Sequence, residues 1–179
     1  MDFEQYFKKN KQKLVEKWIA AVIATYPAES VKFFNNTKDP FANPVGSTIK
    51  RSIDLLFAQV VKKKMDTTAV KEALDLIIRL RAVQEFTPSQ AISFIFTIKH
   101  LFQKSLDKYR PDKDVDLFLE DVVSNVDELI LFAVDIYGKY REKIYLLRIN
   151  QAKESLKKLL IKKEIMCEIP DVDSGRQTL

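Results

Sequence analysis

Apolar residues recur at helical spacing along most of this chain, and this periodicity constrains the fold more than any other feature. The clearest stripe lies between residues 49 and 61 and consists of Ile49, Ile53, Leu56, Phe57, Val60 and Val61. A second stripe extends from Val115 to Tyr137. This spacing places apolar side chains on one face of a helix. Because no segment alternates apolar and polar residues as a strand does, we predict an all-α fold, either a bundle or a globin-like packing of several helices.

The composition supports a single helical domain. The 179 residues include only 3 Gly, which is poor material for a fold with many turns, and 46% are hydrophobic against 31% charged. Such a chain is long enough to bury one substantial core. We predict an all-helical domain over residues 1–165 and a flexible C-terminal tail over residues 166–179.

The sequence also predicts a compartment. Its one cysteine, Cys167, excludes an internal disulfide and suits a reducing environment. The stretch "MDFEQYFKKNKQK" lacks the apolar region of a signal peptide, and no apolar run approaches the roughly 20 residues that span a bilayer. We therefore expect a cytoplasmic protein without a membrane partner.

Capping residues predict where the helices begin. We expect Asp2 to start a helix that ends near Thr25, Pro27 to open a short helix, Ser47 or Thr48 to cap the next one, and Asp66 to cap a helix that ends near Phe86. The strongest local signal is a capping box of Thr87 and Gln90, with Pro88 at the first helical position. The helix that it opens is expected to continue to Arg110, before Pro111.

The C-terminal part of the chain is predicted to be a long basic helix. Its apolar side carries Tyr145, Ile149, Leu156 and Leu160. Gly138 leaves two alternatives, a bend or one helix that passes straight through. A basic helix with one apolar side suits a coiled coil or a groove on a partner, so these four residues are a candidate dimer or output surface.

The sequence gives little support for a catalytic site or a bound cofactor. The chain has no phosphate-binding loop, dinucleotide fingerprint, zinc-protease motif, calcium loop or nucleophile elbow. Its one histidine, His100, lies opposite the apolar stripe of its helix, as a solvated histidine does. We expect no enzyme activity, no cofactor and no metal site. The net charge of +5 allows a nucleic-acid partner without requiring one, and the lysines lack a DNA-reading motif, so we do not expect nucleic acid.

A polar cluster interrupts the apolar pattern at "RLRAVQEFTPSQ", residues 79–90, where Arg79, Arg81, Gln84 and Glu85 precede the capping box. One interpretation is that the arginines extend to solvent around a helix end while the other residues support the junction. The other interpretation is a polar pocket between helices, in which Arg81 is the buried partner of an anion or carboxylate.

Several segments together resemble a known family. They are "TYP" and "FF", followed by "DPFANPVG", "IIRLRAVQEFTPSQAISF" and "FAVDIYGKYREKIYLLRINQ". They are similar to the N-terminal domain of RsbR- and RsbRD-type co-antagonists of the kinase RsbT, regulators in sigma-factor stress signalling. The resemblance extends from about residue 3 to residue 160. Its most specific parts are the arginine-rich junction and the "DPFANPVG" loop.

The resemblance implies a globin-like helical domain without haem, usually a homodimer, that receives a signal or binds a protein partner. We find no counterpart of the STAS domain that carries the phosphorylated threonines in full-length co-antagonists, so we expect a stand-alone version of the module. If the family position matters, a pocket or interface at the junction would involve Arg79, Arg81, Gln84, Thr87 and Ser89, with Asn43 and Pro44 nearby. The alternatives are a ligand- or haem-binding globin-like sensor and, more weakly, a nucleic-acid-binding helical protein.

Overall fold

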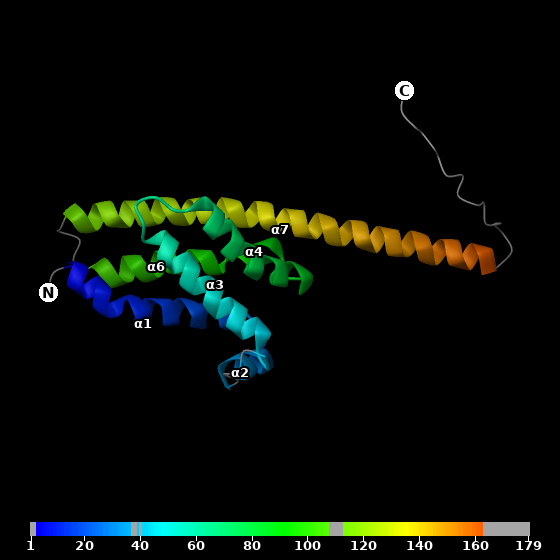
Figure 1. The fold of residues 1–179 in the computed structure, drawn as a ribbon, viewed down its shortest axis with the longest axis horizontal. Coiled ribbons are helices and arrows are strands. Elements are labelled where there is room, and N and C mark those ends of the chain that lie inside the picture. Colours follow the sequence, from blue (N-terminus) through cyan, green and yellow to red (C-terminus); the bar gives the residue numbers. More distant parts are fainter. Residues whose placement is uncertain (1–2, 37–38, 40, 108–112, 163–179) are drawn as a thin grey trace, which may run out of the picture. The chain divides into compact units, whose positions relative to one another are not determined.

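A computed structural model describes residues 3–36, 39, 41–107 and 113–162, and this part of the chain is helical without any strand (Figure 1). The helices in chain order are α1 (Phe3–Ile23), α2 (Ala28–Asn36), α3 (Pro44–Val60), α4 (Thr67–Val83), α5 (Pro88–Ile92), α6 (Phe94–Leu106) and α7 (Lys113–Lys162). The all-α prediction is confirmed, and so is the long C-terminal helix, which spans 50 residues and passes through Gly138 without a break.

The chain divides into two compact units, and the boundary lies within α7, between Arg141 and Glu142. The first unit holds α1 to α6 and the beginning of α7. The described part of the second unit is the remainder of α7, residues 142–162. The domain predicted over residues 1–165 stays a prediction, and the predicted tail lies outside the described residues.

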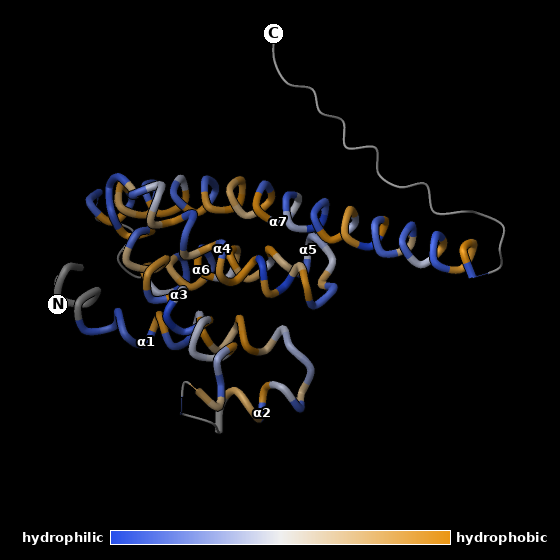
Figure 2. Tube along the Cα trace, turned by 45° about the vertical axis from the view of Figure 1, so that its right-hand side comes forward, coloured by the Kyte–Doolittle hydropathy of each residue, from blue (hydrophilic) through white to orange (hydrophobic). Residues whose placement is uncertain are grey.

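The core of the first unit is built from the helical stripes. Helix α3 contacts α4 and α1, and α1 also contacts α6. The first five residues of the stripe at 49–61 are fully buried, and Val61 is half-buried. Figure 2 shows apolar and polar residues alternating in short bands along α7, as an amphipathic helix requires. The largest fully buried side chains include Trp18, Phe57, Phe94, Phe102 and, unusually, Arg81.

Polar side chains of α7 fix its first part to the ends of two other helices. The Asn125 Nδ2 amide donates to the carbonyls of Val60 at 2.9 Å and Lys62 at 2.7 Å, where α3 ends. The Tyr137 hydroxyl donates to the carbonyl of Phe86, just after α4. These bonds satisfy carbonyl groups at the end of α3 and in the turns that follow α3 and α4.

Helix α3 begins earlier than the sequence predicted. Its N-cap is Asn43, not Ser47 or Thr48, and the Asn43 Oδ1 accepts a 2.9 Å hydrogen bond from the Gly46 backbone N–H. Pro44 fits the first helical position because its fixed φ is helical and the missing N–H would have no partner there. The Asn-Pro pair was therefore the real start signal.

Two other predicted helix starts are confirmed. Asp66 caps α4 through hydrogen bonds from the backbone N–H groups of Thr68 and Ala69 at 3.0 and 3.2 Å. The capping box of Thr87 and Gln90 is present at the start of α5.

The continuous helix predicted after Pro88 is wrong, because the chain breaks at Ser93 into α5 and α6. Side chains from distant helices donate hydrogen bonds to carbonyl groups at the break. The Trp18 Nε1 donates to the carbonyl of Phe94 at 2.8 Å, and Arg81 occupies two further carbonyls there. The predicted end at Arg110 lies outside the described residues. No helix in the described part of the chain combines the length and apolarity that a bilayer crossing requires.

Candidate functional site

Arg81 occupies a core position in the last turn of α4. The buried face of this helix carries Val70, Leu74, Ile77 and Ile78, and Arg81 continues the same stripe. Helical spacing therefore places Arg81 on the same side of α4 as the buried apolar residues. The side chain is 0% exposed, so the guanidinium does not extend to solvent as the first interpretation of the sequence required.

The Arg81 guanidinium joins the end of α1 to the break between α5 and α6. Its Nη1 donates to the carbonyls of Gln90 at 3.0 Å and Ala91 at 3.4 Å. Its Nη2 donates to the carbonyl of Val22 at 3.3 Å and to the Thr25 Oγ1 at 2.8 Å. A cation is favourable beside carbonyl groups at helix ends, because these carry partial negative charge.

Three aromatic rings surround the same group. The guanidinium carbon of Arg81 lies 4.8 Å from the ring centroid of Phe94, 5.1 Å from that of Phe86 and 5.4 Å from that of Tyr26. Ring faces attract a cation at these distances, and more strongly when water is excluded. The ring contacts therefore offset part of the cost of burying the charge.

No carboxylate forms an ion pair with Arg81 within the described residues, and its Nε has no hydrogen-bond partner there. Burial lowers the pKa of the Arg81 guanidinium, an effect that neighbouring Tyr26 opposes. An arginine nevertheless stays protonated in proteins. The first unit therefore contains a buried positive charge held by carbonyls, one hydroxyl and aromatic rings.

A shallow pocket of about 310 Å³ lies beside this charge. It is lined by Thr25, Pro27, Gln84, Glu85, Phe86, Gln90 and Ser93. Three of these residues, Thr25, Phe86 and Gln90, also contact Arg81. The buried charge thus stands directly behind the pocket wall, and we name this hollow the junction pocket.

One left-handed residue and several hydrogen bonds define the backbone beside the junction pocket. Glu85 has a φ of 62°, a left-handed conformation that costs a residue with a side chain roughly 1 kcal/mol. The Phe86 N–H donates to the carbonyl of Arg81 at 3.2 Å, which closes the last turn of α4. The capping box then starts α5, with the Thr87 N–H donating to the Gln90 Oε1 at 3.0 Å.

The structure brings together only some of the residues that the sequence singled out. Gln84 lines the junction pocket and Arg81 lies behind it. Arg79, Thr87 and Ser89 are exposed and are not among the pocket-lining residues. Their assignment to a ligand or an interface stays a prediction.

Asn43 is buried for a local reason. Its Nδ2 donates to the carbonyl of Phe34 at 3.1 Å while its Oδ1 caps α3, so it ties the end of α2 to the start of α3. Neither contact involves a residue that lines the junction pocket. The predicted proximity of Asn43 to the arginine cluster therefore finds no support in these contacts.

The residues that α1 and the following turn contribute to this site were not predicted from the sequence. Thr25 and Tyr26 meet Arg81 across more than fifty positions of sequence. The Tyr26 hydroxyl is buried and has no hydrogen-bond partner among the described residues. Burial raises its pKa against the opposing charge of Arg81. The only sequence signal was the "TYP" segment of the family resemblance.

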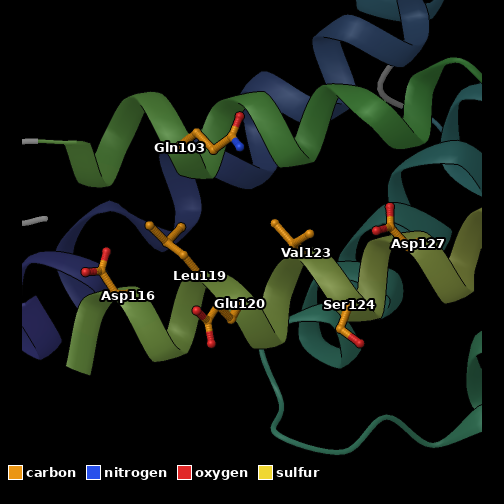
Figure 3. A pocket seen from close by; sticks show the side chains of 7 residues that line it. All are labelled: Gln103, Asp116, Leu119, Glu120, Val123, Ser124 and Asp127. Carbon is orange, nitrogen blue, oxygen red and sulfur yellow. The ribbon is translucent and has the colours of Figure 1, made fainter. Parts of the chain in front are cut away.

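A larger groove of about 630 Å³ lies between α6 and the first part of α7 (Figure 3). Gln103 faces it from α6, and the α7 wall contributes Asp116, Leu119, Glu120, Val123, Ser124 and Asp127. Figure 3 shows Leu119 and Val123 directed towards the α6 side. The Lys99 Nζ bonds to the Asp127 carboxylate at 3.0 Å, beside the groove. We name this feature the α6–α7 groove.

Large apolar side chains are exposed in the second unit. The exposed fractions of Tyr145, Ile149 and Leu156 are 51%, 49% and 57%. Leu160, the fourth residue predicted on this surface, is half-buried. Their role as a dimer or output surface stays a prediction.

The described residues offer no metal site and no enclosed histidine. They contain no group of three or more His, Cys, Asp or Glu side chains that could hold a metal ion. His100 is exposed on α6. Cys167 lies outside the described residues.

Comparison with known proteins gives one result. Neither the curated proteins nor the solved structures yield a match to the chain. Residues 12–152 match the sequence model of the RsbT co-antagonist protein rsbRD N-terminal domain. Because this match covers well over half of the 179 residues, the chain belongs to the family of the rsbRD N-terminal domain.

Proposed function

We propose that this protein is a non-enzymatic regulatory module of a sigma-factor pathway, and that it acts through protein contacts as a homodimer. Its family is named for a co-antagonist of RsbT, which supports a regulatory role. The observation that carries the contact role is the set of large apolar side chains exposed along residues 142–162. Exposed apolar surface of this extent on a helix is typical of an interaction site.

The dimer is tested by changing the exposed apolar side. We expect the native protein to sediment as a dimer and the Ile149→Asp/Leu156→Asp variant to sediment as a monomer. The matched control is Asn150→Asp/Lys157→Asp, which places the same residue type on another side of the helix and keeps the dimer. Circular dichroism checks that both variants remain helical. A dimer that survives the first pair of changes contradicts the assignment.

A second candidate function is the sensing of a small ligand in the junction pocket. It is favoured by the buried charge of Arg81 behind a wall formed by Thr25, Phe86 and Gln90. A ligand there would act on the residues that join three helices. Native mass spectrometry of the purified protein tests this role: a reproducible extra mass, lost in Gln90→Ala, supports it. The exposed position of His100 gives no support to a haem ligand.

The cytoplasmic location and the globin-like character of the fold stay predictions from the sequence. Both agree with a regulatory domain of this family, and neither is needed for the dimer test above.

A further inference from the structure

The two ends of α7 carry opposite charge. Residues 113–137 hold seven carboxylates and one lysine, whereas residues 142–162 hold six basic side chains and two glutamates. The first stretch belongs to the first unit and the second stretch to the second unit. Charge separated so completely along one helix gives the chain two surfaces that attract each other.

The acidic stretch forms one wall of the α6–α7 groove. Asp116, Glu120 and Asp127 line the groove, and none of the basic side chains that the structure describes does. Asp127 is paired with Lys99, but Asp116 and Glu120 make no ion pair with any described residue. Leu119 and Val123 supply the apolar part of the surface. From Asp116 to Asp127 the wall extends about 16 Å at the rise of an α-helix.

The basic stretch has the matching form. Tyr145, Ile149, Ala152, Leu156 and Leu159 recur at alternating spacings of four and three residues, the pattern of a helix that contacts another helix along a narrow seam. The exposed fractions of Ile149, Leu156 and Leu159 are 49%, 57% and 59%. Arg148 and Lys153 occupy the helical positions on either side of this seam. The seam covers about 21 Å, enough to fill the groove.

We infer that residues 142–162 of one copy dock in the α6–α7 groove of a second copy, and that the second copy returns the same contact. This inference rests on the homodimer of the proposed function and specifies its geometry. A two-fold dimer then contains the groove contact twice. Arg148 and Lys153 lie against Asp116 and Glu120, and the apolar seam covers Leu119 and Val123.

Two arguments select this occupant. Pairing two basic stretches with each other would place six cations beside six cations, which is repulsive at low salt. Occupation of the groove by the same chain would require a break in α7, because the groove wall and the basic stretch belong to one uninterrupted helix. A second copy supplies the complementary surface without either cost.

Charge reversal with mutual rescue tests the contact in the full-length protein. The groove variant is Asp116→Lys/Glu120→Lys and the helix variant is Arg148→Glu/Lys153→Glu. In a homodimer of either variant, both groove contacts pair side chains of like charge. Sedimentation at low salt should therefore show the dimer Kd raised more than about tenfold. An equimolar mixture restores both contacts and should return the dimer as a heterodimer. High salt should weaken the native dimer, because it screens the attraction between the two surfaces. Neither variant should form a tighter dimer than the native protein at high salt.

Matched controls keep the charge changes and move them off the two surfaces. They are Glu128→Lys/Asp135→Lys for the groove and Lys143→Glu/Lys158→Glu for the basic stretch, and both should leave the dimer Kd within about twofold of the native value. A dimer that persists in the groove and helix variants but is lost in Ile149→Asp/Leu156→Asp overturns this inference and leaves the proposed dimer standing. A native protein that stays monomeric at low salt overturns both. Variants that dissociate without rescue on mixing also refute the groove contact.

Discussion

The Nη2 of Arg81 donates a 2.8 Å hydrogen bond to the Thr25 Oγ1, and this bond links the last turn of α4 to the turn that follows α1. The Thr25 hydroxyl in turn donates to the carbonyl of Val22 at 2.7 Å. Arg81 also donates to that carbonyl, so the three groups form a closed network. A network of this kind makes one arginine responsible for the position of several helix ends.

Replacing Arg81 should therefore destabilise the fold strongly. Arg81→Met is expected to lower the free energy of unfolding by about 2–4 kcal/mol, because buried carbonyls lose their donors. Arg81→Lys should lose nearly as much, since one ammonium cannot reproduce the planar fork. Urea unfolding measures both. Arg79→Met, on the exposed side of the same helix, is the control and should change stability by less than about 0.5 kcal/mol.

Tyr26→Phe should be neutral or stabilising at neutral pH, by up to about 1 kcal/mol. It removes a buried hydroxyl that has no hydrogen-bond partner in the part of the chain that the structure describes. The effect should grow at alkaline pH. The folded-state pKa of Tyr26 is raised above its ordinary value of 10.0, so the tyrosine of the unfolded chain deprotonates first as the pH rises. The native protein therefore loses stability above pH 10, and Tyr26→Phe lacks this loss.

Urea unfolding at neutral and alkaline pH, with native protein and Tyr26→Phe side by side, measures this difference. The stability of the native protein should fall more steeply above pH 10 than that of the variant. A clear loss of stability in Tyr26→Phe at neutral pH would show instead that the hydroxyl has a partner in solution.

Thr87→Ala should weaken the helix junction. The change removes the side-chain half of the capping box, and we expect a loss of about 0.5–2 kcal/mol in the free energy of unfolding. Thr67→Ala is the matched control, because α4 is capped by Asp66 and not by Thr67. Thermal unfolding followed by circular dichroism should separate the two variants. Equal melting temperatures would contradict a stabilising role for the capping box.

Two glycines should respond in opposite directions to the same change. An added Cβ at Gly138 meets no atom within 4 Å, so Gly138→Ala should stabilise the protein by about 0.5–1 kcal/mol through better helix propensity. At Gly46 the added Cβ would meet the Asn43 carboxamide carbon at 2.8 Å. Gly46→Ala should therefore disturb the cap of α3 and destabilise the protein. Calorimetric melting of both variants checks the signs, and a stabilised Gly46→Ala would disprove the role of the cap.

Local features of the sequence predicted most of the helices. The stripe from Ile49 to Val60, the cap at Asp66 and the box at Thr87 all act within a few residues, so the pattern and its structure coincide. The start of α3 was predicted wrongly even though its signal was local, because the Asn43–Pro44 pair was assigned to a loop. The candidate site was predicted only in part, as Arg81 and Gln84 without Thr25 or Tyr26.

The sequence by itself determined the helical class, the amphipathic faces and the opposite charges at the two ends of α7, because each depends on residue type and spacing alone. Only the tertiary structure decided that Arg81 is buried and that the chain breaks at Ser93. Both depend on hydrogen bonds with α1. Trp18 donates to the carbonyl of Phe94 and the carbonyl of Val22 accepts from Arg81, and the two residues of each pair are more than fifty positions apart in the sequence. Helical spacing states which face a residue occupies, but the identity of its partners is set by which helices come together.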